Sequence, residues 1–361
     1  MQLPQRYTLA QLPTPLSVMP AELLAELLSD GPGGRRFAAQ EMPQLIIKHD
    51  ELTGFLVSGN KIRKLEFVLA AAREQGATHI VTCGGWQSNH CRATAVVCRR
   101  WGLEPVLLLR VEDPTPEPPL VGNYLIDRTL GATIVRISHA EYAERSSRMQ
   151  QVAERLRAEG HVPFVVPEGA SSGLGAVGYM EAVRELGQQI ALEDREPVDT
   201  LVAAVGSGGT VAGLQLGADI YTGVIERVHG VCVCNDAATF EQLCTKIRME
   251  ALQELYDGNA TQSYAEPKVP LTFDDAHIGE GYAKTYPAMM HDLVNLARRR
   301  AILLDPVYTG KAWHALLQTL RRDPKSLGER ICFVHTGGTF GLFAQPEPLE
   351  AAIRALDERS A

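Results

Sequence analysis

The chain lacks the features that mark membrane, secreted and metal-binding proteins. No apolar run approaches the ~20 residues that a membrane-spanning helix needs. The first twenty residues contain four prolines and lack the charged-then-apolar order of a secretory signal. The seven cysteines include no CxxC pair, which disfavours a zinc site and favours reduced, buried thiols. We therefore expect a cytoplasmic protein with no bound metal and no membrane partner.

Basic patches and repeats are absent as well. The net charge of -8 is spread along the chain without a basic stripe, so we expect no nucleic-acid partner. There are no internal repeats at solenoid spacing and no low-complexity segments. With 361 residues, of which 45% are hydrophobic, the chain is longer than one usual core requires. This length predicts two domains, or one domain with a large insertion.

Helices and strands are expected to alternate from residue 58 onward. Short apolar runs rich in β-branched residues predict strands at residues 79–82, 105–110, 133–137, 163–166, 200–205, 228–233 and 331–334. Segments with helical periodicity separate them, which is typical of a parallel sheet covered on both faces. We expect an α/β fold with two open parallel-sheet domains, the first ending near residues 169–175.

Lys61 lies at the expected start of a helix over residues 61–75. Ser58 and Asn60 before it are residue types that cap helices. The partial positive charge of a helix N-terminus disfavours an ammonium, so Lys61 is a candidate for a Schiff-base lysine. A plain surface lysine in a first turn is the commoner case, and this stretch alone favours it.

Four polar or glycine-rich junctions follow expected strands, where parallel sheets bind ligands. In the first, Ser88, Asn89 and His90 present side chains and amides at a helix N-terminus, which suits a carboxylate. A capping turn is an equal alternative there. The fourth junction, residues 335–339, contains Thr336 and suits either a hydrogen bond to a heterocycle or a simple turn.

The second junction consists of Gly206, Ser207, Gly208, Gly209 and Thr210, after the strand at residues 200–205. Its run of amides before a helix favours a site for one phosphate over a plain tight turn. It fits neither the GxGxxG nor the GxxxxGK[ST] pattern, which disfavours nucleotides.

The third junction, residues 304–311, is expected at another passage from strand to helix. Its Tyr308 offers either an acidic hydroxyl or a packed ring, and the local sequence favours packing.

In this order, the four junctions resemble the pyridoxal-phosphate enzymes of the tryptophan synthase β-subunit fold (fold type II). The similar group contains D-cysteine desulfhydrase and 1-aminocyclopropane-1-carboxylate (ACC) deaminase. The matching segments are residues 58–66, 84–92, 166–179, 206–213, 281–282, 305–311 and 335–338. The resemblance implies a large cofactor-binding domain of residues 1–60 plus 175–361, a small domain of residues 61–174, and a homodimer.

The resemblance also implies that pyridoxal 5'-phosphate is the cofactor and that Lys61 forms its Schiff base. Asn89 is implied to hold the phenolic oxygen of the cofactor, and Thr336 its pyridine nitrogen. The loop of residues 206–210, together with Lys64, is implied to hold the phosphate.

For the substrate, a small amino acid, the resemblance implies that Ser88, Asn89 and His90 bind the carboxylate. Tyr308 is implied to act as an acid, base or leaving-group partner, with Tyr282 as a second tyrosine across the site.

The implied reaction is β-elimination from a small D-amino acid, most simply D-cysteine to sulfide, pyruvate and ammonia. Thr309 and His90 are the residues that resemble desulfhydrases rather than ACC deaminases. Trp86, Glu168 and residues 283–286 depart from the usual pattern, and Trp86 is expected to reshape the substrate pocket. ACC ring opening, biosynthetic β-replacement and a ligand-binding protein without activity are the alternatives.

Overall fold

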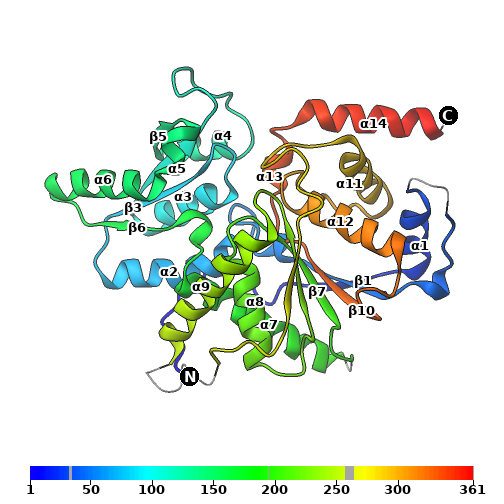
Figure 1. Cartoon of the computed structure of the whole chain (residues 1–361). Helices are drawn as coiled ribbons and strands as arrows, with labels where there is room; N and C mark the ends of the chain where they lie inside the picture. The colour runs from blue at the N-terminus through cyan, green and yellow to red at the C-terminus, as the bar shows by residue number, and fades with distance from the viewer. Residues whose placement is uncertain (32–34, 194, 257–263, 361) are drawn as a thin grey trace.

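Both ends of the sequence contribute to the larger of two β-sheets (Figure 1), which has six strands among the described residues. The computed structural model describes residues 1–361 except 32–34, 194, 257–263 and 361. The strand order in this sheet is β1-β2-β10-β7-β8-β9. The bounds are β1 Leu16–Met19, β2 Gln44–Lys48, β7 Thr200–Val205, β8 Val228–Cys232, β9 Leu271–Asp274 and β10 Arg330–Val334. All neighbouring strands are parallel except β1, which pairs antiparallel with β2.

The smaller sheet has four parallel strands in the order β5-β4-β3-β6. Its strands are β3 His79–Gly85, β4 Glu104–Arg110, β5 Thr133–Ile137 and β6 Pro163–Val165. The two parallel sheets confirm the predicted fold class, with the antiparallel edge strand β1 as the exception.

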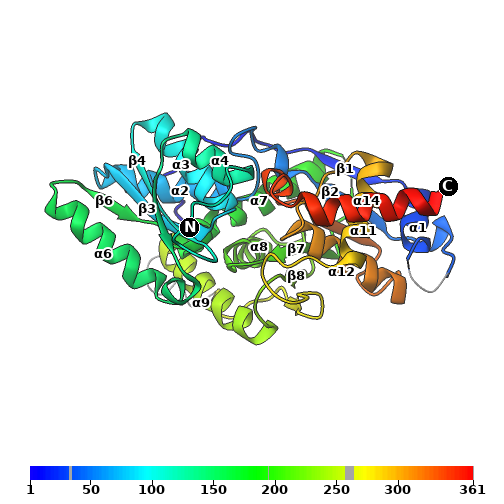
Figure 2. The ribbon, with the colours of Figure 1, turned by 90° about the horizontal axis from the view of Figure 1, so that it is seen from above.

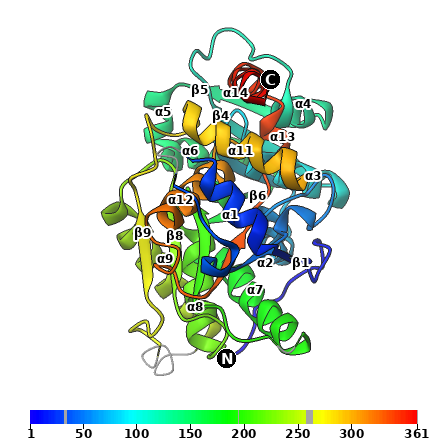
Figure 3. The same cartoon turned by 90° about the vertical axis from the view of Figure 1, so that its right-hand side faces the viewer.

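Helices cover both faces of the larger sheet, as the view from above shows (Figure 2). One apolar cluster joins the sheet to α7 (Gly173–Leu192), α8 (Gly209–Ile220) and α9 (Ala237–Leu255). The other joins it to α1 (Ala21–Ser29), α11 (Pro287–Arg300) and α12 (Thr309–Arg322). The C-terminal helix α14 (Pro346–Ser360) packs on α11 (Figure 3). Covered faces explain why these strands are apolar throughout rather than alternating.

The smaller sheet is covered in the same way. Its helices are α2 Lys61–Glu74, α3 Asn89–Trp101, α4 Gly122–Thr129, α5 His139–Ala143 and α6 Arg145–Ala158. Helices α2, α3 and α4 pack on one face, and α5 and α6 pack on the other. Because α2 contacts both α3 and α7, the exact domain boundary between residues 60 and 61 stays a prediction.

Three local predictions are wrong. The single helix expected at residues 140–158 is two helices, because Ser138 forms a capping box that starts α5 and Glu144 leaves helical geometry. No strand lies directly before Tyr308, since residues 301–307 are coil and turn, so the third junction is a helix start after coil. Asn60 and Ser58 make no cap for α2, since Ser58 donates to the carbonyl of Glu51 and Asn60 bonds elsewhere.

The cysteines in the structure are all free, and six of the seven are buried. Among the described residues, no helix has the length and apolarity to span a membrane. Among the same described residues, no group of three or more His, Cys, Asp or Glu side chains is arranged so that it could hold a metal ion.

Candidate active site

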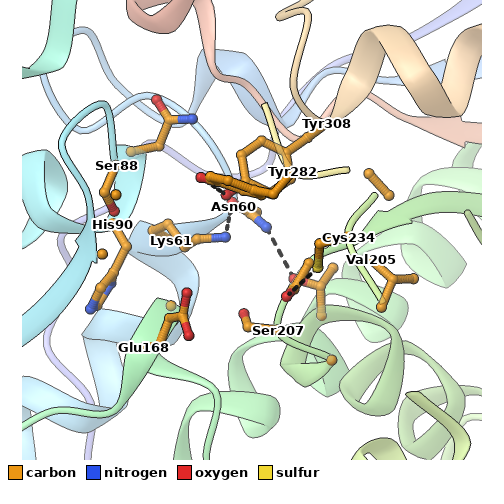
Figure 4. A pocket seen from close by; sticks show the side chains of 18 of the residues that line it. Asn60, Lys61, Ser88, His90, Glu168, Val205, Ser207, Cys234, Tyr282 and Tyr308 are labelled. Atoms are coloured by element: carbon orange, nitrogen blue, oxygen red, sulfur yellow. Dashed lines mark hydrogen bonds between the residues drawn. The ribbon is translucent and has the colours of Figure 1, made fainter. Parts of the chain in front are cut away.

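One cavity collects residues from the carboxyl ends of strands in both sheets. It has an empty volume of about 1120 Å³ and is lined by segments that follow β3, β7, β8 and β10, together with the start of α2. Figure 4 shows Lys61, Ser88, Tyr282 and Tyr308 pointing into this space. The four junctions that lie far apart in the sequence therefore meet at a single site.

Lys61 is the first residue of α2 and lies inside the cavity. Its Nζ donates to Oδ1 of Asn60 at 3.1 Å and lies 5.8 Å from the centre of the Tyr308 ring. Burial disfavours the ammonium and lowers the pKa of Lys61 to about 8, although the Asp305 and Glu168 carboxylates act in the opposite direction. At pH 7, roughly a tenth of Lys61 is thus a neutral, nucleophilic amine, far more than for an ordinary lysine.

Asn60 connects this lysine to the glycine-rich loop. Its Nδ2 donates to Oγ1 of Thr210 at 3.0 Å, while its backbone N donates to the carbonyl of Thr336 at 3.0 Å. Asn60 was not among the predicted site residues, and its position beside Lys61 was the only signal for it in the sequence.

The loop after β7 lines the cavity with Gly206, Ser207, Gly208 and Thr210. Gly208 has φ of +77°, and α8 begins at the next residue. A helix N-terminus preceded by exposed amides binds anions, so this loop suits a phosphate. Gly206 must lack a side chain because a Cβ there would lie 2.7 Å from Cε1 of Tyr308.

Gly209 and Lys64 lie behind this loop rather than on the cavity wall. The Gly209 amide donates to Oγ of Ser171 at 3.3 Å, and Nζ of Lys64 donates to the same oxygen at 3.1 Å. Ser171 also bonds Oγ of Ser207 at 2.8 Å. Burial, together with the nearby charge of Lys61, lowers the pKa of Lys64 well below its usual range. Lys64 therefore supports the loop from behind. It does not line the cavity, so it can act on a bound phosphate only indirectly, through the loop.

The loop after β3 presents the N-terminus of α3 to the cavity. Ser88 caps the helix by accepting from the amide of Cys91 at 3.2 Å. Oδ1 of Asn89 accepts from Nδ2 of Asn123 at 3.0 Å, so its own amide group remains a donor. The first-turn amides of α3 lack intrahelical partners and suit a carboxylate.

His90 contributes to this site as a neutral side chain. It is buried, and one ring nitrogen bonds Oγ1 of Thr82 at 2.8 Å. Burial first, and then the charges of Lys61 and Lys64, lower the pKa of His90 well below its usual range. Any contribution of His90 to carboxylate binding thus comes from its amide or a neutral imidazole.

Two tyrosines form a hydrogen-bonded pair above Lys61. The hydroxyls of Tyr282 and Tyr308 lie 2.8 Å apart, and both rings line the cavity. Burial raises the pKa of Tyr282 to about 12 and that of Tyr308 well above its usual range, so both are protonated at neutral pH. The Asp305 carboxylate fixes Tyr308 by accepting from its backbone N at 2.9 Å.

Lys311 holds the segment that carries Tyr282. Its ammonium donates to the carbonyls of Ile278 at 2.6 Å and Gly281 at 2.7 Å. Because Lys311 lies on α12, which begins directly after Tyr308, it fixes the two tyrosines relative to each other.

Thr336 lines the cavity as predicted, whereas Trp86 does not. The Trp86 ring lies edge-on to Tyr124, 6.2 Å between centres, within an apolar cluster on α3 and α4. Trp86 thus lies off the cavity wall, and its expected effect on the substrate pocket stays a prediction.

Several charged and polar wall residues were missed. Arg110 ends β4, Tyr142 lies on α5, and Arg145 starts α6 and bonds Glu168 at 3.0 Å. Cys234 also lines the cavity, with a pKa that burial raises to about 11. The signal available for Arg110 was its place at the carboxyl end of a predicted strand.

The chain was compared with known proteins. A family model for pyridoxal-phosphate dependent enzyme matches residues 35–337. A mitochondrial bifunctional D-cysteine desulfhydrase/1-aminocyclopropane-1-carboxylate deaminase of Arabidopsis thaliana is 38% identical over 307 residues, which cover 83% of this chain and 73% of the relative. A D-cysteine desulfhydrase of Salmonella paratyphi A is 35% identical over 342 residues, covering 94% of this chain and 95% of the relative. The crystal structure of an ACC deaminase homologue superposes with a TM-score of 0.81 at 31% identity, covering 97% of both chains.

Proposed function

Because the chain belongs to the family of pyridoxal-phosphate dependent enzymes, we propose that it is a lyase that removes a β-substituent from a small D-amino acid, most simply D-cysteine. The observation that carries this proposal is the placement of the Lys61 amine 5.8 Å from the Tyr308 ring, in a cavity that also holds two helix N-termini. A lyase of this kind needs a neutral amine, an acid and two anion sites together.

The cavity residues fit the cofactor. The glycine-rich loop lines the cavity with backbone and no bulk at Gly206, where a Cβ would lie 2.7 Å from Cε1 of Tyr308. Lys61 would hold the cofactor covalently, the loop amides would hold its phosphate, and Asn89 and Thr336 would hydrogen-bond its ring. When bound, pyridoxal phosphate accepts the electron pair that is left when the Cα proton is removed.

The protein groups then divide the remaining work. The free Lys61 amine takes the Cα proton, which its lowered pKa of about 8 permits near neutral pH. The amides at the start of α3, with Ser88 and Asn89, orient the substrate carboxylate. Tyr308, protonated because burial raises its pKa, donates a proton to the departing β-substituent. The hydrogen bond between the Tyr282 and Tyr308 hydroxyls orients the Tyr308 hydroxyl for this proton transfer.

ACC ring opening is the second candidate, since the relatives' names include ACC deaminase. Thr309 argues against it. Its hydroxyl is buried and bonds Oδ1 of Asp305 at 2.7 Å, so this position offers the cavity no carboxylate. β-Replacement, in which an added nucleophile takes the place of the leaving group, uses the same residues and is separated from elimination by product analysis.

The test is a screen of the purified holoenzyme for pyruvate and ammonia release. Substrates are D- and L-cysteine, D- and L-β-chloroalanine, and ACC, with and without an added thiol. We expect pyruvate from D-cysteine and little 2-oxobutanoate from ACC. Turnover of ACC alone, or a thiol adduct in place of pyruvate, would overturn the proposed reaction.

We also propose that the protein is a cytoplasmic homodimer. This rests on the resemblance to the family and its bacterial relatives. Light scattering on the purified holoenzyme measures the molecular mass, and a monomer would contradict the proposal. Fractionation of cells that express the chain tests its location.

A further inference from the structure

Arg110 is a cavity residue for which the proposed reaction has no use. It ends β4 and lines the cavity from the side of the smaller sheet. Its guanidinium carbon lies 4.7 Å from the centre of the Tyr142 ring and 4.9 Å from that of Tyr282. Two aromatic rings hold the guanidinium in place through cation–π contacts, which leave its N–H donors free for hydrogen bonds.

The other charged groups of the cavity already have partners or tasks. Arg145 pairs with Glu168 at 3.0 Å, and Lys61 is the reactive amine. Within the described part of the chain, Arg110 makes no ion pair, and its guanidinium has the two ring contacts but no hydrogen bond. The donors of Arg110 are therefore available to bind an anion in the cavity.

Space for that anion is kept open by Gly85. A Cβ at this position would lie 3.8 Å from Nη2 of Arg110 and 3.5 Å from Cε1 of Tyr282. Because glycine carries no side chain, a ligand atom has access to the guanidinium and the tyrosine together.

The location of Arg110 indicates which part of a substrate it meets. Tyr308 lies next to Lys61, Tyr282 bonds Tyr308 at 2.8 Å, and Arg110 packs on Tyr282. A substrate whose Cα lies at Lys61 and whose carboxylate lies at α3 has only its side chain left to extend toward the tyrosine pair. The group that reaches Arg110 is then the end of that side chain.

We propose that Arg110 is a specificity-determining residue that binds an oxyanion, such as a carboxylate, at the end of the substrate side chain. This deepens the proposed function and rests on it for the placement of Cα at Lys61. The preferred substrates are small amino acids whose β-substituent carries a negative charge. D-Cysteine meets this requirement only as its thiolate.

The first experiment measures binding and needs no turnover. Wild-type holoenzyme and the Arg110→Gln and Arg110→Lys holoenzymes are titrated by calorimetry with glutamate and glutamine, and with aspartate and asparagine, as both enantiomers. In at least one pair, wild type should bind the acid about tenfold more tightly than the amide, as one charge-assisted hydrogen-bonded pair implies. Arg110→Gln should remove this preference and leave the affinity for the amide unchanged, whereas Arg110→Lys should keep part of it.

Arg100→Gln is the matched control, because Arg100 is exposed in the last turn of α3 and does not line the cavity. It should behave as wild type. An equal loss of acid and amide binding in Arg110→Gln would mean that Arg110 holds the α-carboxylate or only supports Tyr282. That result, or a wild type without preference for acids, would overturn the proposal.

The second experiment separates this proposal from the proposed reaction. S-Carboxymethyl-D-cysteine and its uncharged analogue S-carbamoylmethyl-D-cysteine are compared as substrates by pyruvate release. Arg110→Gln should reduce kcat/KM for the first about tenfold and leave the second unchanged. If neither yields pyruvate but acids still bind preferentially, the reaction is wrong and the role of Arg110 stands. If both react equally well in wild type, the role of Arg110 is wrong and the reaction stands.

Discussion

The two sides of the cavity differ in the chemistry that they present. We call the residues contributed by the larger sheet and its connections the large-sheet wall; it consists of the glycine-rich loop, Tyr282, Tyr308, Thr336 and their neighbours. The small-sheet wall consists of the α3 N-terminus and the segments after β4, β5 and β6. The large-sheet wall carries no charged side chain, whereas the small-sheet wall carries Arg110, Arg145 and Glu168.

This difference separates two tasks. Backbone amides and neutral hydroxyls suffice to hold a cofactor that is the same in every turnover, and they cost little desolvation. Charged side chains distinguish one substrate from another, because an unpaired charge penalises the wrong ligand. The comparison therefore predicts that changes in the large-sheet wall affect all substrates alike, whereas changes in the small-sheet wall alter their ranking.

The largest effect is expected for Lys61, which lies between the two walls. Lys61→Ala should lower turnover of every substrate by roughly four orders of magnitude or more, because it removes both the cofactor attachment and the base. The absorbance band of the lysine-bound cofactor should disappear. Lys246→Ala is the control, since that side chain is 73% exposed on α9. A variant that kept the band and the turnover would remove Lys61 from the mechanism.

Tyr308→Phe should have the next largest effect. It keeps the ring against Gly206 but removes the hydroxyl, so kcat should fall roughly 100-fold for every substrate while the cofactor band remains. Stopped-flow and steady-state assays measure this directly. Tyr286→Phe is the control, because Tyr286 bonds the carbonyl of His277 at 3.1 Å and does not line the cavity. A change confined to one substrate would contradict the division of tasks.

Gly208→Ala tests the phosphate loop. The φ of +77° is costly for alanine. The hydrogen bond from the Gly209 amide to Oγ of Ser171 restrains the loop, so it has little room to relax. We expect cofactor affinity to fall about tenfold in equilibrium dialysis, with the substrate ranking unchanged. Gly223→Ala is matched in strain, since φ is +79° there and no atom lies within 4 Å of the added Cβ. It should lower stability comparably without weakening cofactor binding.

The smallest effect concerns pH. Lys61 must be neutral to attach the cofactor, and burial lowers its pKa to about 8. The rate at which apoenzyme takes up the cofactor should therefore rise with pH, about fivefold from pH 7 to pH 8, and level off above pH 9. The control is Nα-acetyl-lysine, whose ε-amine is free, mixed with the cofactor. Its rate of reaction with the cofactor should keep rising toward pH 10. The same continued rise in the protein would show that Lys61 has an ordinary pKa.

The sequence predicted those features of the fold that depend on residues close together in the chain. Strand β7 was predicted at its observed bounds, because a short apolar run rich in β-branched residues is a property of neighbouring residues. The antiparallel strand β1 was not predicted, because its four residues are ordered by pairing with β2. Short edge strands have little signal of their own, since their stability comes from distant chain segments.

In the candidate active site, too, the sequence predicted the features that depend on neighbouring residues. Gly206 and Ser88 were predicted because loops after parallel strands carry their own composition. Trp86 and Lys64 were expected in the cavity and lie outside its wall, and Arg110 lies on the wall without having been expected. Nothing in a short stretch of sequence indicates the direction in which a long side chain turns.

The sequence by itself determined the fold class and the residue types at each strand end, because periodicity, glycine runs and helix starts act over a few residues. It indicated the cofactor only through its resemblance to a known family. Tertiary structure decided the composition of the cavity. Lys61 and Lys64 lie one helical turn apart, yet one enters the cavity and the other is covered by Ser171 and the loop before α8. Packing of the two sheets sets that difference, because it fixes which polar groups are excluded from water and which remain available to a ligand.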